Sequence, residues 1–157
     1  MADMPTPGSP APDFSGTDQN GDSIQLSDFA GRPLALYFYP KDDTPGCTKQ
    51  ACNLRDGTGE LAAAGVAVVG VSADSKESHE RFAEKHSLPF SLLPDPDHEI
   101  LNAYGVWGER SFYGKKIVGI KRTTFLIGAD GHILHVFKRP KTDNHTAEIL
   151  AKLDALT

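Results

Sequence analysis

The sequence is organised around one segment, residues 34–52, which reads LALYFYPKDDTPGCTKQAC. Its first part, Leu34 to Tyr39, is apolar and aromatic throughout, as expected for a strand that is buried on both faces of a sheet. A helix-start signal follows at Thr44-Pro45. The segment therefore predicts a buried strand that passes through a short loop into a helix, and it places both cysteines of the chain, Cys47 and Cys52, on that helix.

On the N-terminal side of this segment, Asn20-Gly21 is a tight-turn signal that predicts a small β-hairpin. Residues 27–31 are expected to form one helical turn that Gly31 closes. The helix that begins at Thr44 is expected to run to about Ala63, with Gly57 and Gly59 as weak points.

Towards the C-terminus, strand and helix patterns alternate and then give way to a hairpin and a closing helix. This order predicts an α/β protein with a thioredoxin-like fold, in which a central mixed β-sheet is flanked by helices and preceded by the N-terminal β-hairpin. The expected elements are strands at 66–71 and 88–93, helices at 75–86 and 97–104, hairpin strands at 123–127 and 133–137, and a helix at 144–156.

Composition narrows the class of protein. A chain of 157 residues is expected to be one domain, residues 1–157, of which the proline-rich residues 1–10 are expected to be flexible. The net charge of −5 argues against a partner that is a nucleic acid or an anionic membrane. No run is apolar enough for a membrane span, and no signal peptide is recognisable. Two cysteines are too few for a secreted disulfide scaffold, so a cytoplasmic location is expected.

The position of Cys47 favours an anionic sulfur. If Thr44 is the N-cap, its hydroxyl is expected to accept a hydrogen bond from the first turn, Pro45 is the first helical residue and Cys47 the third. Free N–H groups and the helix dipole favour a negative charge there. Helix N-termini and nearby cations lower thiol pKa values by one to several units. The alternative is that Cys47 is a buried structural cysteine.

The second cysteine, Cys52, follows Cys47 by five residues. On an unbroken helix this offset separates the two Cα atoms by about 8.5 Å, whereas a disulfide requires less than about 7 Å. We therefore expect a fully folded reduced form, and an oxidised form in which at least the first turn and a half of the helix is unwound. The alternative for Cys52 is a small hydrophobic residue of the core.

A positively charged side chain is needed beside the thiolate, and Arg122 is the leading candidate. It directly precedes the strand 123–127, which the topology places beside the strand 34–39, and its guanidinium can donate several hydrogen bonds. Lys121 and Lys116 are alternatives, as is a surface ion pair for Arg122. No metal and no cofactor is expected, because the spacing of the cysteines matches no zinc pattern. We expect most of the histidines, at positions 79, 86, 98, 132, 135 and 145, to lie at the surface.

The pattern Pro40-x-x-x-Thr44-x-x-Cys47, together with Arg122, resembles the active-site signature of peroxiredoxins. The resemblance is strongest to the bacterioferritin comigratory protein (PrxQ) group, and it spans about residues 8–155. The stretches that carry it are residues 37–48 with Cys52, 113–116, 122–127 and 141–145.

This resemblance implies an antioxidant enzyme, a thioredoxin-dependent peroxiredoxin of the atypical two-cysteine type. It would reduce hydrogen peroxide and organic hydroperoxides through a sulfenic acid on Cys47, and an intramolecular disulfide with the resolving Cys52 would follow. Thioredoxin or a similar dithiol protein would regenerate the pair. By the same resemblance Pro40 shields the pocket, Thr44 and Arg122 position the peroxide, and the protein is expected to be a monomer.

Two other functions are compatible with the same residues: a dithiol–disulfide oxidoreductase, and a redox sensor that signals by unwinding its helix. Position 50 is Gln where many members of the resembled group have Glu, which removes an ion-pair partner for the active-site base. Residues 105–114 are rich in glycine and aromatic residues. We expect them to form a loop packed over the core, with an apolar rim for peroxide or reductant as the alternative.

Overall fold

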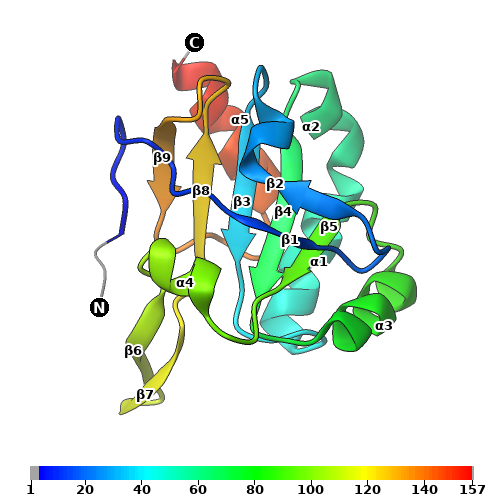
Figure 1. Cartoon of the computed structure of the whole chain (residues 1–157), viewed down its shortest axis with the longest axis vertical. Coiled ribbons are helices and arrows are strands. Elements are labelled where there is room, and N and C mark those ends of the chain that lie inside the picture. Colours follow the sequence, from blue (N-terminus) through cyan, green and yellow to red (C-terminus); the bar gives the residue numbers. More distant parts are fainter. Residues whose placement is uncertain (1–3, 157) are drawn as a thin grey trace.

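The structure, a computed structural model, describes residues 4–156 and is built on a five-stranded mixed sheet (Figure 1). The strand order is β5-β4-β3-β8-β9, with β3, β4 and β5 parallel and β8 antiparallel to both of its neighbours. The predicted central mixed sheet is confirmed. Its strands are β3 Leu34–Phe38, β4 Ala67–Ser72, β5 Ser91–Pro94, β8 Thr123–Ile127 and β9 Ile133–Phe137.

Most of the helices cover one face of the sheet, and the N-terminal hairpin covers the other face together with one short helix (Figure 1). Within residues 4–156, no helix is both long and apolar enough to cross a membrane. One face carries α1 Pro45–Asp56, α2 Thr58–Ala63, α3 Lys76–His86 and α5 His145–Leu156. The other carries the hairpin of β1 Ser15–Thr17 and β2 Ser23–Gln25, the 3₁₀ turn η1 Leu26–Phe29, and α4 Glu99–Ala103.

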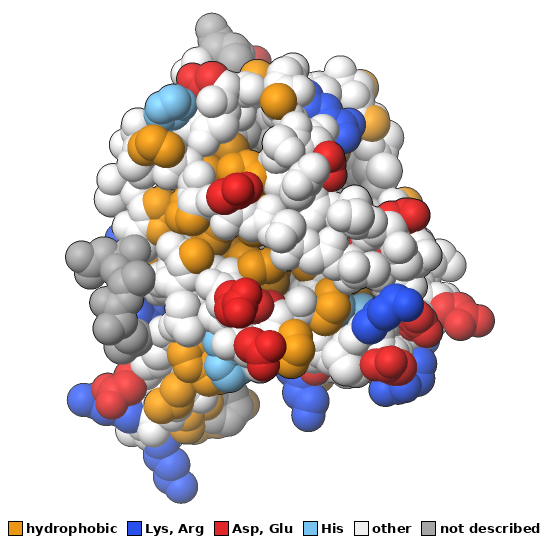
Figure 2. All heavy atoms as spheres, viewed as in Figure 1, with side chains coloured by type: hydrophobic (Ala, Val, Ile, Leu, Met, Phe, Trp, Pro, Cys, Tyr) orange, Lys and Arg blue, Asp and Glu red, His pale blue; other side chains and the backbone are white. Residues whose placement is uncertain are grey.

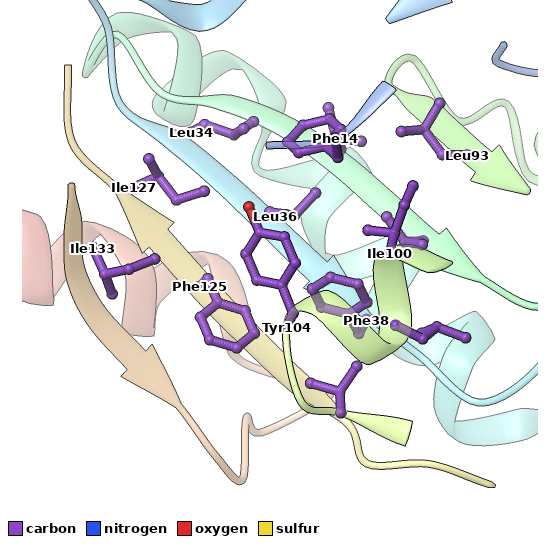
Figure 3. Packing of buried hydrophobic residues seen from close by; sticks show 14 of the residues in the cluster. Phe14, Leu34, Leu36, Phe38, Leu93, Ile100, Tyr104, Phe125, Ile127 and Ile133 are labelled. Carbon is purple, nitrogen blue, oxygen red and sulfur yellow. The ribbon is translucent and has the colours of Figure 1, made fainter. Parts of the chain in front are cut away.

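The central strand β3 contributes side chains to both halves of the core because successive residues of a strand point to opposite faces. Leu34, Leu36 and Phe38 pack in the cluster drawn in Figure 3, where Tyr104 and Phe125 surround Phe38. On the opposite face, Tyr37 and Tyr39 pack in the cluster that includes Cys47. Each fully buried side chain of this size contributes about 1.5–3 kcal/mol of hydrophobic free energy.

The expected helix from Thr44 to Ala63 is two helices, which meet at Gly57 as the weak point predicts. At the other elements the expected boundaries are within a few residues of those observed. The strand expected from Leu88 begins only at Ser91, beyond Pro89, whose ring lacks the N–H that a sheet ladder needs.

Residues 105–114 differ from the expectation of a loop packed over the core. Most of them belong to a hairpin, β6 Trp107–Phe112 and β7 Lys115–Ile120, which extends away from the sheet (Figure 1). Tyr113 and Gly114 both have positive φ, 50° and 76°, as a two-residue type I′ turn requires. Figure 2 shows hydrophobic and basic side chains beside one another over this hairpin.

The N-terminal segment is tied to the sheet, although its composition predicts loose order. The main-chain N–H of Gly8 donates to Ile133 at 2.8 Å, that of Ile133 to Ser9 at 2.9 Å, and that of Ala11 to Gly131 at 2.9 Å. Residues 1–3, for which flexibility is also expected, lie outside the described residues.

We predict that Gly57→Ala lowers the free energy of unfolding by about 1–3 kcal/mol, as overpacking typically does. A Cβ atom at Gly57 would overlap the side chain of Thr146 on α5. Thr146 has little room to move, because its N–H donates to Asn53 Oδ1 at 2.8 Å and its hydroxyl to the Asn53 carbonyl at 2.9 Å. Denaturant unfolding measures the effect. Gly59→Ala, where a Cβ meets open space, is the matched control, and equal stability of the two variants would contradict the prediction.

Candidate active site

The loop after β3 ends in the predicted helix start. Thr44 is the N-cap in extended conformation and α1 begins at Pro45, which makes Cys47 its third residue. The first helical main-chain bond runs from Thr48 N to Thr44 O at 2.8 Å. The N–H groups of Gly46 and Cys47 therefore lie before the helical ladder begins, in the turn that attracts an anion.

The Thr44 hydroxyl does not cap the helix, so the expectation that it accepts a bond from the first turn is wrong. It donates instead to the Lys41 carbonyl at 2.8 Å. Asp43 between them has a left-handed φ of 59°, which turns the chain and brings the Lys41 carbonyl within reach. Thr44 thus closes the loop in front of Cys47 and leaves the first N–H groups of the helix without a side-chain cap.

Arg122, which directly precedes β8 of the sheet, forms hydrogen bonds with two residues of α1, one of them at the sulfur of Cys47. Its Nη2 donates to Cys47 Sγ at 3.3 Å, and its Nη1 donates to Gln50 Oε1 at 2.6 Å. Cys47 and Gln50 are buried. Of the three candidate cations, Arg122 is the one for which a hydrogen bond to Cys47 is found in the described part of the chain. Lys116 lies exposed on β7, in the hairpin that extends away from the sheet.

The sheet register explains why Arg122 reaches the helix. Thr123, the first residue of β8, lies opposite Phe38, the last residue of β3. Arg122 therefore sits at the carboxyl end of β3, the edge where sites in open α/β sheets lie. A Cβ atom at Gly46 would lie 3.1 Å from Arg122 Nη2. Glycine at this position thus leaves room for the guanidinium against the first turn of α1.

A buried hydrogen-bond network beneath the loop holds it to α3. The carboxylate of Asp42 accepts hydrogen bonds from the Tyr39 hydroxyl at 2.6 Å and from Ser78 Oγ at 2.8 Å, and it contacts His79 Nδ1 at 2.7 Å. The Asp42 N–H donates to Asp74 Oδ2 at 2.8 Å. This network was not predicted from the sequence, in which its one signal is an acidic residue just after a strand buried on both faces.

Two of the histidines expected at the surface, His79 and His145, are fully buried, and each faces a carboxylate. Among residues 4–156, one group could offer a metal ion three ligand atoms, namely Asp42, Asp74 and His79. Hydroxyl and N–H donors already face both carboxylates of this group. We therefore interpret it as a hydrogen-bonded anchor of the loop.

His145 lies at the start of α5, between Glu148 Oε1 at 3.0 Å from Nδ1 and Thr124 Oγ1 at 2.8 Å from Nε2. Burial lowers the pKa of His145 from its ordinary value of 6.5; Glu148 opposes this shift and the charge of Arg122 adds to it. The neutral ring then donates from Nδ1 to the carboxylate and accepts from the threonine hydroxyl.

This lowered pKa predicts a stability that falls on acidification. The unfolded chain binds the His145 proton more readily than the folded chain does. The free energy of unfolding should therefore decrease as the pH falls below about 6.5, until the pH passes the folded-state pKa. Denaturant unfolding between about pH 7 and pH 5 tests this. His145→Gln should flatten the dependence relative to a control at the exposed His132, and an unchanged slope would contradict the prediction.

The second cysteine lies on the same unbroken helix, so the separation of about 8.5 Å between Cα atoms five residues apart applies. Cys47 is buried, Cys52 is partly buried, and both are free thiols. The Cys52 sulfur lies 3.8 Å from Nδ1 of His86, the last residue of α3. In this folded form the two cysteines occupy different turns of α1, and Arg122 contacts Cys47.

A thioredoxin-like sheet with a cysteine in the first turn of the helix after its central strand, and an arginine against its sulfur, defines a thiol peroxidase of the peroxiredoxin type. The model of the AhpC/TSA family matches residues 7–136, which is most of the chain. The chain belongs to the AhpC/TSA family.

Individual relatives agree with this assignment. Peroxiredoxin Bcp of Escherichia coli strain K12 is 54% identical over 140 residues, which cover 89% of this chain and 90% of that protein. A mutant of Xylella fastidiosa PrxQ superposes with a TM-score of 0.89 at 31% identity, covering 99% of this chain and 98% of that chain. The bacterioferritin comigratory protein of Xanthomonas campestris, described as reducing alkyl peroxides, superposes with a TM-score of 0.86 at 34% identity. The match covers 99% of this chain and 97% of that chain.

Proposed function

We propose that this protein reduces hydrogen peroxide and organic hydroperoxides, with Cys47 as the attacking thiolate and Cys52 as the resolving thiol. The observation that supports this most directly is the hydrogen bond from Arg122 Nη2 to Cys47 Sγ at 3.3 Å, at the third position of α1. A permanent cation and the free N–H groups of a first helical turn both stabilise an anionic sulfur.

In the first step the Cys47 thiolate attacks the terminal oxygen of the peroxide. An S–O bond forms, the O–O bond breaks, and water or an alcohol leaves after taking up a proton. Cys47 is thereby oxidised to the sulfenic acid. Arg122 stabilises the negative charge that develops on the departing oxygen. Thr44 positions the peroxide, the N–H groups of Gly46 and Cys47 assist, and Pro40 shields the pocket.

In the second step Cys52 attacks the sulfenic sulfur, the disulfide forms and water leaves. The start of α1 must unwind for this, because two cysteines five residues apart on a helix are too distant to bond. The second half of the helix is held to α5, since Asn53 bonds with both the N–H and the hydroxyl of Thr146. Unwinding is therefore confined to the part of α1 that carries the reacting sulfur.

Thioredoxin or a similar dithiol protein then reduces the disulfide and restores the helix. Because the resolving cysteine is in the same chain, no second copy has to supply one. We accordingly propose a monomer, working in the cytoplasm, where such reductants keep thiols reduced.

Mass spectrometry after one equivalent of hydrogen peroxide, with and without a thioredoxin system, tests this function. Without the reductant we expect one Cys47–Cys52 disulfide per chain, and with it the free thiols should return. Cys47→Ser should abolish peroxide consumption. If Cys47→Ser removed only the reduction of protein disulfides, a dithiol–disulfide oxidoreductase would be indicated. Oxidation without reductant-coupled turnover would indicate a redox sensor.

A further inference from the structure

Cys52, His86 and Asp43 contact one another in series, and the peroxide-reducing step does not use these three side chains. The Cys52 sulfur lies 3.8 Å from His86 Nδ1, and His86 Nε2 lies 3.3 Å from Asp43 Oδ1. The three residues come from three different segments: the loop before α1, the middle of α1 and the end of α3. A thiol, an imidazole and a carboxylate in this order are the arrangement by which a base and its orienting group activate a nucleophile.

The partners of His86 assign its tautomer. A carboxylate only accepts hydrogen bonds, so Asp43 fixes the proton on Nε2 and leaves the lone pair of Nδ1 directed at Cys52. Asp43 is ionised at neutral pH, as an ordinary aspartate is, and hydrogen bonds from Lys85 first and His86 second lower its pKa further. Lys85 Nζ reaches its other oxygen at 2.8 Å.

His86 is also held in place from the side of α1. Arg55, one turn beyond Cys52, donates from Nη1 to the main-chain carbonyl of His86 at 2.8 Å. The Phe82 ring packs edge-on against the imidazole at 5.3 Å between centroids. These contacts fix His86 to the part of α1 that follows Cys52. The imidazole can therefore remain beside Cys52 when the start of the helix unwinds.

We propose that His86 is the general base for Cys52 when the disulfide forms, and that Asp43 orients it. This inference rests on the proposed function, because it concerns the second step of that reaction. Nδ1 accepts the Cys52 proton as the sulfur attacks the sulfenic sulfur of Cys47. The S–S bond forms, the S–O bond breaks, and the departing hydroxide takes the proton from His86 and leaves as water.

The size of the effect follows from the ionisation of an ordinary thiol, which is only a few per cent thiolate at neutral pH. Without the base, closure should depend on whatever thiolate forms unaided. We therefore expect His86→Gln to slow disulfide closure by about 10–30-fold at neutral pH. Asp43→Asn, which loses only the orienting group, should slow it by less.

Rapid mixing with peroxide, quenching with a thiol-alkylating reagent and mass spectrometry measure sulfenic acid and disulfide separately. His132→Gln, an exposed histidine in the turn between β8 and β9, is the matched control. The charged groups that face His86 are Asp43, Lys85 and Arg55, and Arg55 is paired with Asp56.

The pH profile separates a base from a merely structural residue. In His86→Gln the closure rate should rise with pH and converge on the parent's rate at high pH, where hydroxide can replace the missing base. Equal rates at neutral pH, or a deficit that persists at high pH, would overturn the inference. If the parent chain accumulates sulfenic acid but never the Cys47–Cys52 disulfide, the proposed second step itself fails, and that result is visible in the parent alone.

Discussion

In the Arg122→Met variant, the reaction of Cys47 with hydrogen peroxide is expected to be slower by about 10²–10³-fold. Methionine removes the charge and the donor that lies 3.3 Å from the sulfur, but it retains much of the side chain's volume. The thiolate and the developing charge on the peroxide then lose their cation together. Stopped-flow measurement of the second-order rate constant, in the absence of a reductant, isolates this step from recycling.

Two further variants make this prediction specific. Arg122→Lys keeps the positive charge, but an ammonium cannot reproduce the planar fork that donates to Cys47 and Gln50 at once. We expect it to recover part of the rate and remain about tenfold slower than the parent. Lys116→Met removes a charge from the projecting hairpin and should leave the rate unchanged. An Arg122→Met rate within about threefold of the parent's would show that the guanidinium is not part of the reaction.

The Cys52→Ser variant is expected to form one sulfenic acid per chain and then stop. The first step needs only Cys47 and its neighbours, so the initial reaction with peroxide should keep the parent's rate. Without the resolving thiol no intramolecular disulfide can form, and turnover coupled to thioredoxin should fall by at least about tenfold. Trapping of the sulfenic acid, followed by mass spectrometry and a coupled turnover assay, measures both effects. Unchanged recycling would reject Cys52 as the resolving residue.

The sequence predicted the scaffold well because its strongest signals are local. A wholly apolar run at residues 34–39, the Thr44-Pro45 helix start and the weak point at Gly57 each specify backbone structure through their own chemistry. The topology placed the strand 123–127 beside the strand 34–39, and β8 does pair with β3. The position of Cys47 in the first turn of α1 was predicted by the same signals and is confirmed.

What the sequence left open or missed depends on contacts between distant segments. Arg122 was the leading candidate, but Lys121 and Lys116 stayed open, because spacing along the chain does not contain the register of β3 with β8 that brings Arg122 to Cys47. The same holds for the burial of His79 against Asp42, which are 37 positions apart.

Two other departures are local but lack the usual signals. The hairpin that begins at Trp107 turns at Tyr113-Gly114, and tyrosine is not among the residues that normally mark a type I′ turn. The Thr44 hydroxyl has two possible partners, a helix N–H and the Lys41 carbonyl, and the left-handed turn at Asp43 selects the carbonyl.

We propose that Arg122 and the start of α1 hold the sulfur of Cys47 as a thiolate, and that this thiolate attacks the O–O bond. The most direct test of this proposal is the second-order rate constant of the Cys52→Ser variant with hydrogen peroxide, measured across the neutral pH range. We expect a rate constant that is orders of magnitude above that of free cysteine and nearly independent of pH. A rate constant like that of free cysteine, rising about tenfold per pH unit, would contradict the proposal.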